Sequence, residues 1–209
     1  MLKIAHRGYS KFCIDNSEEA FLEANKNNFD MIELDIQLCK TGEIVVYHDI
    51  FIDNNLVIDV PYEDLKKKKV ITFNYFLQII DISKIKIYLD LKGCESLAHE
   101  LFKIIHFLDK TNIFIGSFNR NHLNILFNYD NTLKLGFITS NTYIPIELDF
   151  LTKNIYFISI EWSELDDNIV NYCRNKNILI FIYTLDNIEI YNNILNKKDV
   201  DGIVSNILF

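Results

Sequence analysis

The sequence predicts an α/β protein with the TIM-type (β/α)8 barrel fold and an extra β-hairpin extension after the second strand. Short apolar strands alternate with helical segments along most of the chain, which is typical of a parallel sheet covered by helices. Eight of the strands are separated by helical crossovers, and 209 residues lie near the lower end of the length range of this barrel. An open doubly wound sheet is the main alternative, but no strand is followed by its glycine-rich G-x-G-x-x-G turn.

The predicted elements follow one another without an internal repeat or a flexible linker, so residues 1–209 are expected to form a single domain. Asn16 and Ser17 are expected to cap the first helix, whose first turn carries Glu18 and Glu19. The segment 49–69 is loop-like and is the one plausible insertion. We expect strands at residues 2–5, 30–36, 85–91, 112–117, 133–138, 155–160, 178–184 and 200–204, and helices at 72–80, 95–108, 119–128, 166–176 and 187–195, with a looser helical segment between the fifth and sixth strands.

Residues 32–49 are expected to form the extra hairpin. Glu33 and Asp35 alternate with apolar residues, which predicts a strand with one polar face, and Thr41-Gly42 supplies a turn. If the turn is centred between those two residues, Asp35 faces His48 and Glu33 lies diagonally beside it. A polar hairpin face in water is the alternative interpretation.

Composition excludes several classes of protein. Hydrophobic residues make up 49% and charged residues 24%, as in globular proteins, and the net charge of −8 argues against a general nucleic-acid binder. The four cysteines contain no C-x-x-C pair, which favours reduced thiols, and no apolar run is long enough for a membrane span. Met1 leads directly into the first strand, which leaves no length for a signal peptide, so we expect a cytoplasmic protein. The basic run at 66–69 is interpreted as a solvated loop or helix end, with a phosphate-binding patch as the alternative. The sequence does not define the oligomeric state.

Polar residues recur where the predicted strands end, and in a TIM-type barrel the chemistry lies at the carboxyl ends of the strands. Each has a structural alternative: His6 could be a structural hydrogen bonder, and Asp90 and Lys92 a surface ion pair. Ser117 and Asn119 are interpreted as caps of the following helix. Because the strand ends converge on one small volume, we favour a functional role for the other polar residues at the strand ends and in the hairpin. They are His6, Arg7, Glu33, Asp35, His48, Asp90, Lys92 and Tyr183. His99, His106 and His122 fall inside predicted helices and are expected to have surface or core roles.

The chemistry of these side chains points to phosphodiester cleavage. Glu33, Asp35 and Asp90 form an oxygen-only set that suits one hard divalent cation, Mg²⁺ or Ca²⁺. Two histidines beside such a cation suit general acid–base catalysis near neutral pH. Arg7 and Lys92 add positive charge for an anionic substrate.

Several motifs resemble those of the glycerophosphodiester phosphodiesterases. They are IAHRGYS at 4–10, DNSEEAF at 15–21, IELDIQL at 32–38, VVYHD at 45–49, YLDLK at 88–92, IGSFN at 115–119, LGFI at 135–138, IYTLD at 182–186 and VDGIVSN at 200–206. Asp90 stands where the family usually has Glu, Asp15 replaces the Glu of a PEN motif, and Tyr183 takes a place often held by Trp. The segment between His48 and Asp90 is short for the family, which suggests a reduced lid.

The resemblance implies a TIM-type barrel in which His6 and His48 are the catalytic pair, Arg7, Lys92 and Tyr183 contact the substrate or its phosphate, and three carboxylates bind the cation. In the implied mechanism the cation and one histidine activate a glycerol hydroxyl or water, and the other histidine protonates the leaving alcohol. The implied substrate is a small glycerophosphodiester, and the products are glycerol 3-phosphate and an alcohol such as choline or ethanolamine. Which histidine is the base stays open at this point.

Two alternative functions remain on the sequence alone. An Asp-Leu-Lys motif also occurs in sphingomyelinase D-type phospholipases, so a phospholipase D-like enzyme acting on (lyso)phospholipids is the first alternative. The second is a non-catalytic phosphodiester-binding barrel that lost turnover through the change at Asp90.

Overall fold

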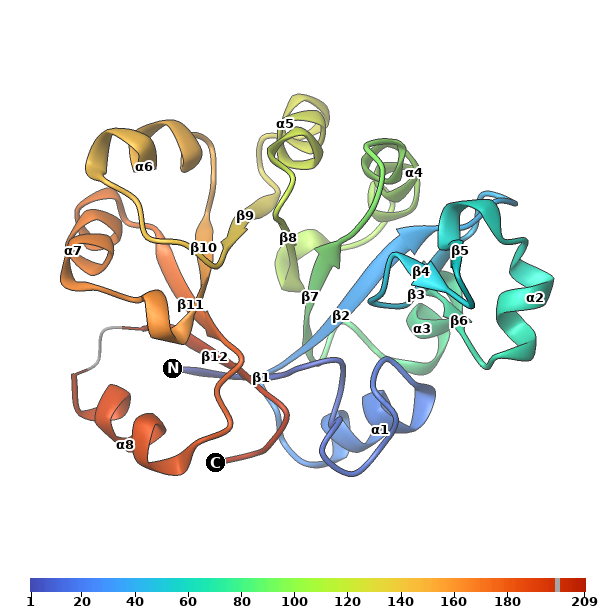
Figure 1. Ribbon diagram of the computed structural model, residues 1–209, viewed down its shortest axis with the longest axis horizontal. Helices are drawn as coiled ribbons and strands as arrows, with labels where there is room; N and C mark the ends of the chain where they lie inside the picture. The colour runs from blue at the N-terminus through green and yellow to red at the C-terminus, as the bar shows by residue number, and fades with distance from the viewer. Residues whose placement is uncertain (198–199) are drawn as a thin grey trace.

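A closed ring of eight parallel strands forms the centre of the protein, whose computed structural model describes residues 1–197 and 200–209 (Figure 1). The ring closes because the first strand pairs in parallel with both the second strand and the last. The barrel strands are β1 (Leu2–Ala5), β2 (Met31–Leu38), β7 (Lys86–Leu91), β8 (Ile113–Ser117), β9 (Lys134–Thr139), β10 (Phe157–Glu161), β11 (Leu179–Tyr183) and β12 (Gly202–Ser205). All eight predicted strands, and the predicted barrel, are confirmed.

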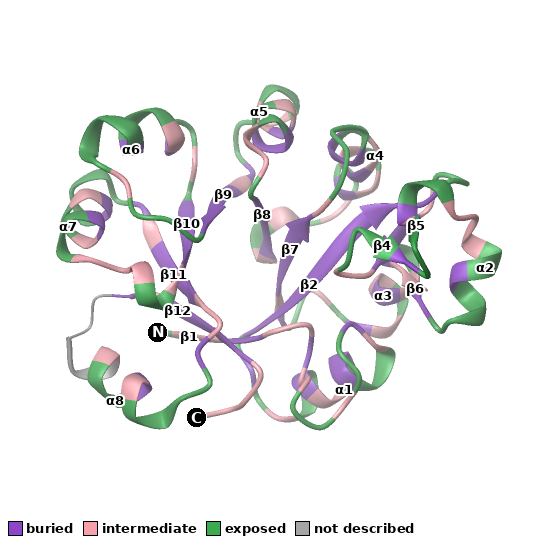
Figure 2. Cartoon of the chain, in the orientation of Figure 1, coloured by how far each residue is buried: buried purple, intermediate pink, exposed green. Residues whose placement is uncertain are grey.

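Helices surround the ring and bury their inner faces against it, while their outer faces are exposed (Figure 2). Ser17 caps α1, accepting a hydrogen bond from the backbone N–H of Ala20, and Asn119 caps α5, as predicted. The helices are α1 (Glu18–Lys26), α2 (Tyr62–Lys67), α3 (Phe73–Ile79), α4 (Ser96–Ile105), α5 (Arg120–Tyr129), α6 (Pro145–Leu151), α7 (Asp167–Lys176) and α8 (Ile188–Lys197). No helix among the described residues is long and apolar enough to cross a membrane.

The chain between β2 and β7 forms a small subassembly outside the ring. Strand β3 (Ile44–Val46) pairs antiparallel with β2, and β6 (Ile71–Thr72) pairs antiparallel with β3, which confirms the expected hairpin extension. The segment predicted to be loop-like instead contains the β4–β5 hairpin (Phe51–Ile52 and Asn55–Leu56), a 3-10 turn (Val57–Asp59) and α2. These elements are too short to show a periodic pattern, and they are stabilised by one buried cluster that includes Val45, Val57 and Leu65.

The register of the β2–β3 pair differs by one residue from the predicted register. Ile36 pairs with Val46, so that Asp35 lies opposite Tyr47, whose backbone N–H donates to the Asp35 carbonyl over 3.0 Å. The prediction that Asp35 faces His48 is therefore wrong. His48 follows the ladder and is not part of it.

The turn explains the shift. The backbone N–H of Cys39 donates to the Glu43 carbonyl, and the N–H of Gly42 donates to the Cys39 carbonyl. These bonds close a three-residue loop over residues 40–42, with Gly42 at φ +93°. A three-residue hairpin loop commonly ends in a left-handed residue, a conformation that glycine adopts at little cost. The predicted two-residue turn would have moved every pair by one position.

Aromatic rings fill the barrel interior beneath the mouth. Tyr88, Phe114, Phe157 and Phe181, from β7, β8, β10 and β11, form one buried cluster. Gly136 makes room for it, because a Cβ atom at this position would lie 2.1 Å from the Phe157 ring. The interior is thus a packed floor beneath the end of the barrel where the strands finish.

Candidate active site

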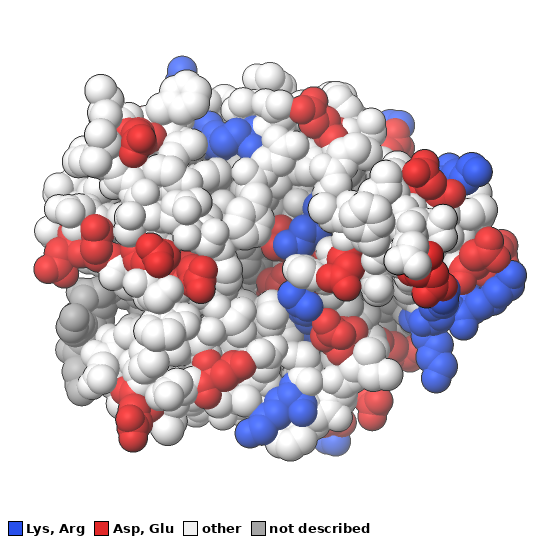
Figure 3. Space-filling view, viewed as in Figure 1, with Lys and Arg blue, Asp and Glu red and all other residues white. Residues whose placement is uncertain are grey.

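One cavity at the mouth of the barrel collects all eight residues that the sequence singled out. It has a volume of about 170 Å³ and is lined by His6, Arg7, Glu33, Asp35, His48, Asp90, Lys92 and Tyr183, with Tyr88, Phe118, Ile138, Ser159, Thr184 and Val204. In the space-filling view, acidic and basic side chains meet in a hollow near the centre of the molecule (Figure 3). The strand ends therefore converge as the sequence predicted.

Three buried carboxylates form the floor of the polar part of the cavity. Each of Glu33, Asp35 and Asp90 offers an oxygen, and these oxygens lie within 4.8 Å of one another. Asp35 and Asp90 are register partners on β2 and β7, and Glu33 precedes Asp35 by two residues on the same face of its strand. Oδ1 of Asp90 is buried and has no hydrogen-bond partner. Such an orphaned acceptor among clustered carboxylates fits the oxygen ligands of a hard divalent cation.

Burial and mutual repulsion make it unfavourable for all three carboxylates to be ionised, even beside Lys92. Nζ of Lys92 lies 2.6 Å from Oδ2 of Asp90 and 3.3 Å from Oδ1 of Asp35. Burial and the neighbouring carboxylates raise the pKa of Glu33 well above its usual range. Burial also raises the pKa of Asp90 to about 7, against the opposing charge of Lys92. For Lys92 itself, burial alone would lower the pKa, but Asp90 and Asp35 outweigh it and the pKa is raised.

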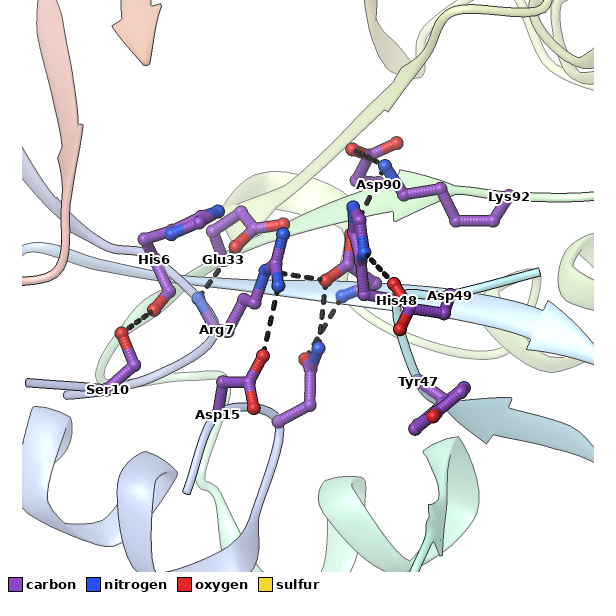
Figure 4. A network of polar contacts seen from close by, with 12 residues as sticks. His6, Arg7, Ser10, Asp15, Glu33, Tyr47, His48, Asp49, Asp90 and Lys92 are labelled. Carbon is purple, nitrogen blue, oxygen red and sulfur yellow. Dashed lines mark hydrogen bonds and ion pairs between the residues drawn. The ribbon is translucent and has the colours of Figure 1, made fainter. Parts of the chain in front are cut away.

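Arg7 is tied to the same carboxylates by its backbone and its side chain (Figure 4). Its backbone N–H donates to Oε2 of Glu33 over 2.7 Å, and its Nε lies 3.3 Å from Oδ2 of Asp35. Nη1 makes a 3.0 Å ion pair with Asp15. Arg7 adopts φ +55°, an uncommon value for a residue with a side chain, which is consistent with a position held by the surrounding contacts.

Asn16 holds Asp35 from the other side, a role that the sequence did not suggest. Nδ2 of Asn16 donates to Oδ2 of Asp35 over 2.8 Å, and Oδ1 accepts from the Asp35 backbone N–H over 3.3 Å. We expected Asn16 and Ser17 to cap the helix together, but Ser17 alone supplies the capping side chain. Asn16 adopts a left-handed conformation, at φ +55°, which Asn tolerates better than most residues, and no pattern in the sequence indicated its contact with Asp35.

Gln37 fixes the segment that carries His48. It is buried on the same face of β2 as Asp35, and its Nε2 donates to the carbonyls of Tyr47 and Asp49 over 2.8 and 2.9 Å. These two residues flank His48, whose Nδ1 lies 2.8 Å from Oδ1 of Asp49. The only sequence signal for this role was the place of Gln37 on the polar face of the strand.

His6 enters the cavity from the end of β1. Its backbone N–H donates to the Ser205 carbonyl over 3.0 Å, which extends the pairing of β1 with β12. Burial lowers the pKa of His6 despite the 2.8 Å contact between its Nδ1 and Oδ1 of Asn206. The imidazole is therefore neutral near pH 7 and able to accept a proton.

Tyr183 forms an aromatic wall of the cavity with Phe118. The two ring centroids are 6.3 Å apart in an edge-to-face arrangement, and Nζ of Lys92 lies 5.4 Å from the Phe118 ring centre. The Tyr183 hydroxyl donates to the Thr139 carbonyl over 2.8 Å, so it has no remaining proton to donate to a substrate.

The residues given structural roles by the sequence behave accordingly. Oγ of Ser117 accepts from the Asn119 backbone N–H, and His122 is fully buried between Ser117 and the Cys94 carbonyl. His99 contacts the Tyr129 hydroxyl on the outer helices. All four cysteines are free thiols.

Carboxylates, two side-chain cations and two histidines at the mouth of a barrel are the groups that a phosphoric diester hydrolase requires. The chain belongs to the glycerophosphoryl diester phosphodiesterase family, whose model matches residues 6–207. It is 26% identical over 229 residues to a glycerophosphodiester phosphodiesterase from Caldanaerobacter subterraneus subsp. tengcongensis, covering 98% of this chain and 93% of that protein. The expected family and enzyme class are thus confirmed.

Solved structures confirm the fold. A glycerophosphodiester phosphodiesterase from Parabacteroides distasonis superimposes with a TM-score of 0.87 at 19% identity, covering 98% of this chain and 92% of the other. A phosphodiesterase from Oleispira antarctica, solved with its product sn-glycerol-3-phosphate, gives 0.86 at 18% identity, covering 99% and 93%.

Proposed function

We propose that this protein hydrolyses glycerophosphodiesters to glycerol 3-phosphate and an alcohol, with a divalent cation and the histidines His6 and His48. The observation that carries the proposal is the buried carboxylate cluster, with its orphaned Asp90 oxygen, in the same cavity as both histidines. We also infer that residues 1–209 act as one catalytic domain, because strands from both ends of the chain pair with each other.

Glu33, Asp35 and Asp90 would hold the cation, Mg²⁺ or Ca²⁺. When bound, it polarises the phosphoryl oxygens and makes the phosphorus easier to attack. With all three carboxylates ionised, Arg7 and Lys92 leave one negative charge, and a bound dication would reverse it. A phosphodiester carries one negative charge, so it is attracted to the loaded site.

The chain's own residues supply the remaining chemistry. Arg7 and Lys92 place positive charge where an anionic phosphodiester would lie, and Phe118 and Tyr183 give it an apolar wall. One histidine takes a proton from the attacking hydroxyl, which belongs to glycerol or to water, and the other gives a proton to the leaving alcohol. Nδ1 of His48 lies 2.8 Å from Oδ1 of Asp49, a contact that orients the imidazole, and we assign His48 as the donor.

The relatives support this substrate class. The Caldanaerobacter relative is a glycerophosphodiester phosphodiesterase, and the Oleispira enzyme binds sn-glycerol-3-phosphate as its product. We infer that the same product leaves the cavity described above.

A substrate panel with metal titration tests the proposal. Purified protein is incubated with glycerophosphocholine, glycerophosphoethanolamine, lysophosphatidylcholine or sphingomyelin, each with EDTA, Mg²⁺ or Ca²⁺. We expect glycerol 3-phosphate from the deacylated diesters only when a cation is present. Headgroup release from the lipids, with little turnover of the deacylated diesters, would contradict the proposal and favour the phospholipase D-like alternative.

A matched variant addresses the non-catalytic alternative. Asp90→Glu adds one methylene to a cation ligand and keeps its charge. Metal-dependent binding of glycerophosphocholine without product in the wild type, together with turnover by Asp90→Glu, would show that the native barrel only binds. We expect turnover by the wild type.

A further inference from the structure

Asn206 and Asp186 do not line the cavity, but together they hold the Nδ1 side of the His6 ring. Asn206 follows β12 and Asp186 follows β11, so neighbouring barrel strands bring them together. Oδ1 of Asn206 lies 2.8 Å from Nδ1 of His6, and Nδ2 of Asn206 donates to Oδ2 of Asp186 over 2.6 Å. The three side chains therefore form one continuous hydrogen-bonded chain.

Asp186 is itself fixed by its neighbours. Its Oδ1 accepts hydrogen bonds from Oγ of Ser205 over 2.9 Å and from the Asn206 backbone N–H over 2.8 Å. A carboxylate can only accept hydrogen bonds, so the side of Asn206 that faces Asp186 must be a donor. The opposite orientation of the amide would place two acceptors 2.6 Å apart.

The orientation of the amide decides where His6 carries its proton. Because Nδ2 of Asn206 faces Asp186, Oδ1 faces His6 and requires a donor there. Oγ of Ser10, 2.7 Å from the same oxygen, can also donate to it. The neutral imidazole is then protonated at Nδ1, and its Nε2 carries a lone pair.

We propose that Asn206 and Asp186 are positioning residues that hold His6 in the tautomer protonated at Nδ1, so that Nε2 accepts the proton of the attacking hydroxyl. The proposal rests on the phosphodiester hydrolysis proposed above. In this step the O–H bond of the nucleophile breaks, its proton forms an N–H bond at Nε2, and the electron pair left on oxygen forms the new bond to phosphorus. The bond from phosphorus to the leaving oxygen breaks, and that oxygen takes a proton from His48. His6 becomes an imidazolium that still donates from Nδ1 to Asn206.

The neutral amide between the imidazole and the carboxylate has a further consequence. The charged groups that act on His6 are Arg7, Asp35 and Asp186, and burial together with Arg7 lowers its pKa. A carboxylate in place of the Asn206 amide would contact the imidazole directly and raise that pKa. With the neutral Asn206 amide next to the imidazole and Asp186 beyond it, His6 stays unprotonated to a lower pH than it would if a carboxylate contacted the ring directly.

Two-bond ¹H–¹⁵N correlation spectra of labelled protein at neutral pH measure the tautomer without any turnover. The five histidines are distinguished by comparison with His6→Gln. We expect His6 to be protonated at Nδ1 in the wild type and in Ser10→Ala, which removes the other donor to Asn206. In Asp186→Asn the amide of Asn206 is free to turn, so we expect a substantial population protonated at Nε2.

Enzyme kinetics provide the second readout. We expect Asp186→Asn to lower kcat on the order of 10–100-fold with a smaller change in KM. The double variant Asp186→Asn/Asn206→Asp restores the hydrogen-bond pattern with the charge next to the imidazole. We expect it to recover the Nδ1 tautomer and part of kcat, and to move the acidic limb of kcat/KM upward by about one pH unit.

A wild-type His6 protonated at Nε2 would overturn the proposal, as would an Asp186→Asn variant whose tautomer and pH profile are unchanged. Failure of the proposed function has a different signature. In that case glycerophosphodiesters are not hydrolysed, while the tautomer spectra still respond to Asp186→Asn.

Discussion

Tyr47 lies opposite Asp35 in the β2–β3 ladder and donates its backbone N–H to the Asp35 carbonyl over 3.0 Å. His48 therefore comes one residue after the last backbone bond to β2 and is not held by the ladder. Gln37 holds it instead, through the carbonyls on either side. A side chain on the barrel strand thus sets the position of a histidine in the loop.

Replacing Gln37 by Leu tests this support. The substitution leaves two carbonyls without their donor, which we expect to destabilise the fold by about 1–3 kcal/mol. Because the loop is released, we expect kcat to fall about 10-fold with little change in cation affinity. Steady-state kinetics and calcium titration of the variant, with Gln37→Asn as a shorter amide control, measure both effects. A Gln37→Leu enzyme with wild-type kcat would show that the loop holds His48 without this side chain.

The carboxylate cluster predicts that the cation-free protein becomes less stable as pH rises. The folded-state pKa of Asp90 is raised from 3.8 to about 7, so the protonated form is favoured by folding. Its contribution is present at low pH and is lost as pH rises from about 4 through about 7. We expect the Tm in EDTA to be roughly 5 °C lower at pH 8 than at pH 5, by differential scanning fluorimetry.

A cation replaces those protons, so added Mg²⁺ or Ca²⁺ should raise Tm more at pH 8 than at pH 5. Asp90→Asn is the matched control, because its amide does not titrate and it lacks a ligand charge. We expect a smaller pH dependence and a smaller cation effect in this variant. Equal cation effects in the wild type and in Asp90→Asn would argue against the cluster as the binding site.

Arg7→Lys tests the need for a guanidinium. Arg7 reaches Asp35 and Asp15 with two different nitrogens, and a single ammonium cannot replace both contacts and also bind phosphate in a bidentate manner. We expect KM for glycerophosphocholine to rise about 10-fold at saturating cation. Asp15→Ala removes only the partner whose side chain is 49% exposed, so its effect on KM should be smaller. The reverse order of the two effects would show that Asp15 and not the guanidinium controls binding.

Much of the barrel was predictable because strands buried on both faces leave continuous apolar runs in the sequence. The site residues were predictable for the same reason, since polar residues such as Glu33 and Asp90 stand out at the ends of such runs. Short elements of the insertion were not predictable, because packing around Leu65 stabilises them and no periodic pattern marks them.

Contacts between distant segments, and the register of the hairpin, could not be predicted from the sequence either. The hairpin register depended on whether the turn holds two residues or three, and Thr41-Gly42 is compatible with both. The bonds from Asn16 to Asp35 and from Asn206 to His6 join residues that are 19 and 200 positions apart. Amide side chains of this kind are common on surfaces, so their type alone did not identify them.

We propose that a cation bound by the carboxylates and a histidine base together cleave the phosphodiester. The most direct test measures glycerol 3-phosphate released from glycerophosphocholine by protein stripped with EDTA, before and after Mg²⁺ or Ca²⁺ is restored, in the wild type and in His6→Ala. We predict no product from the stripped protein, recovery in the wild type, and a kcat at least about 100-fold lower in His6→Ala. Activity that survives EDTA, or that is undiminished in His6→Ala, would contradict the mechanism.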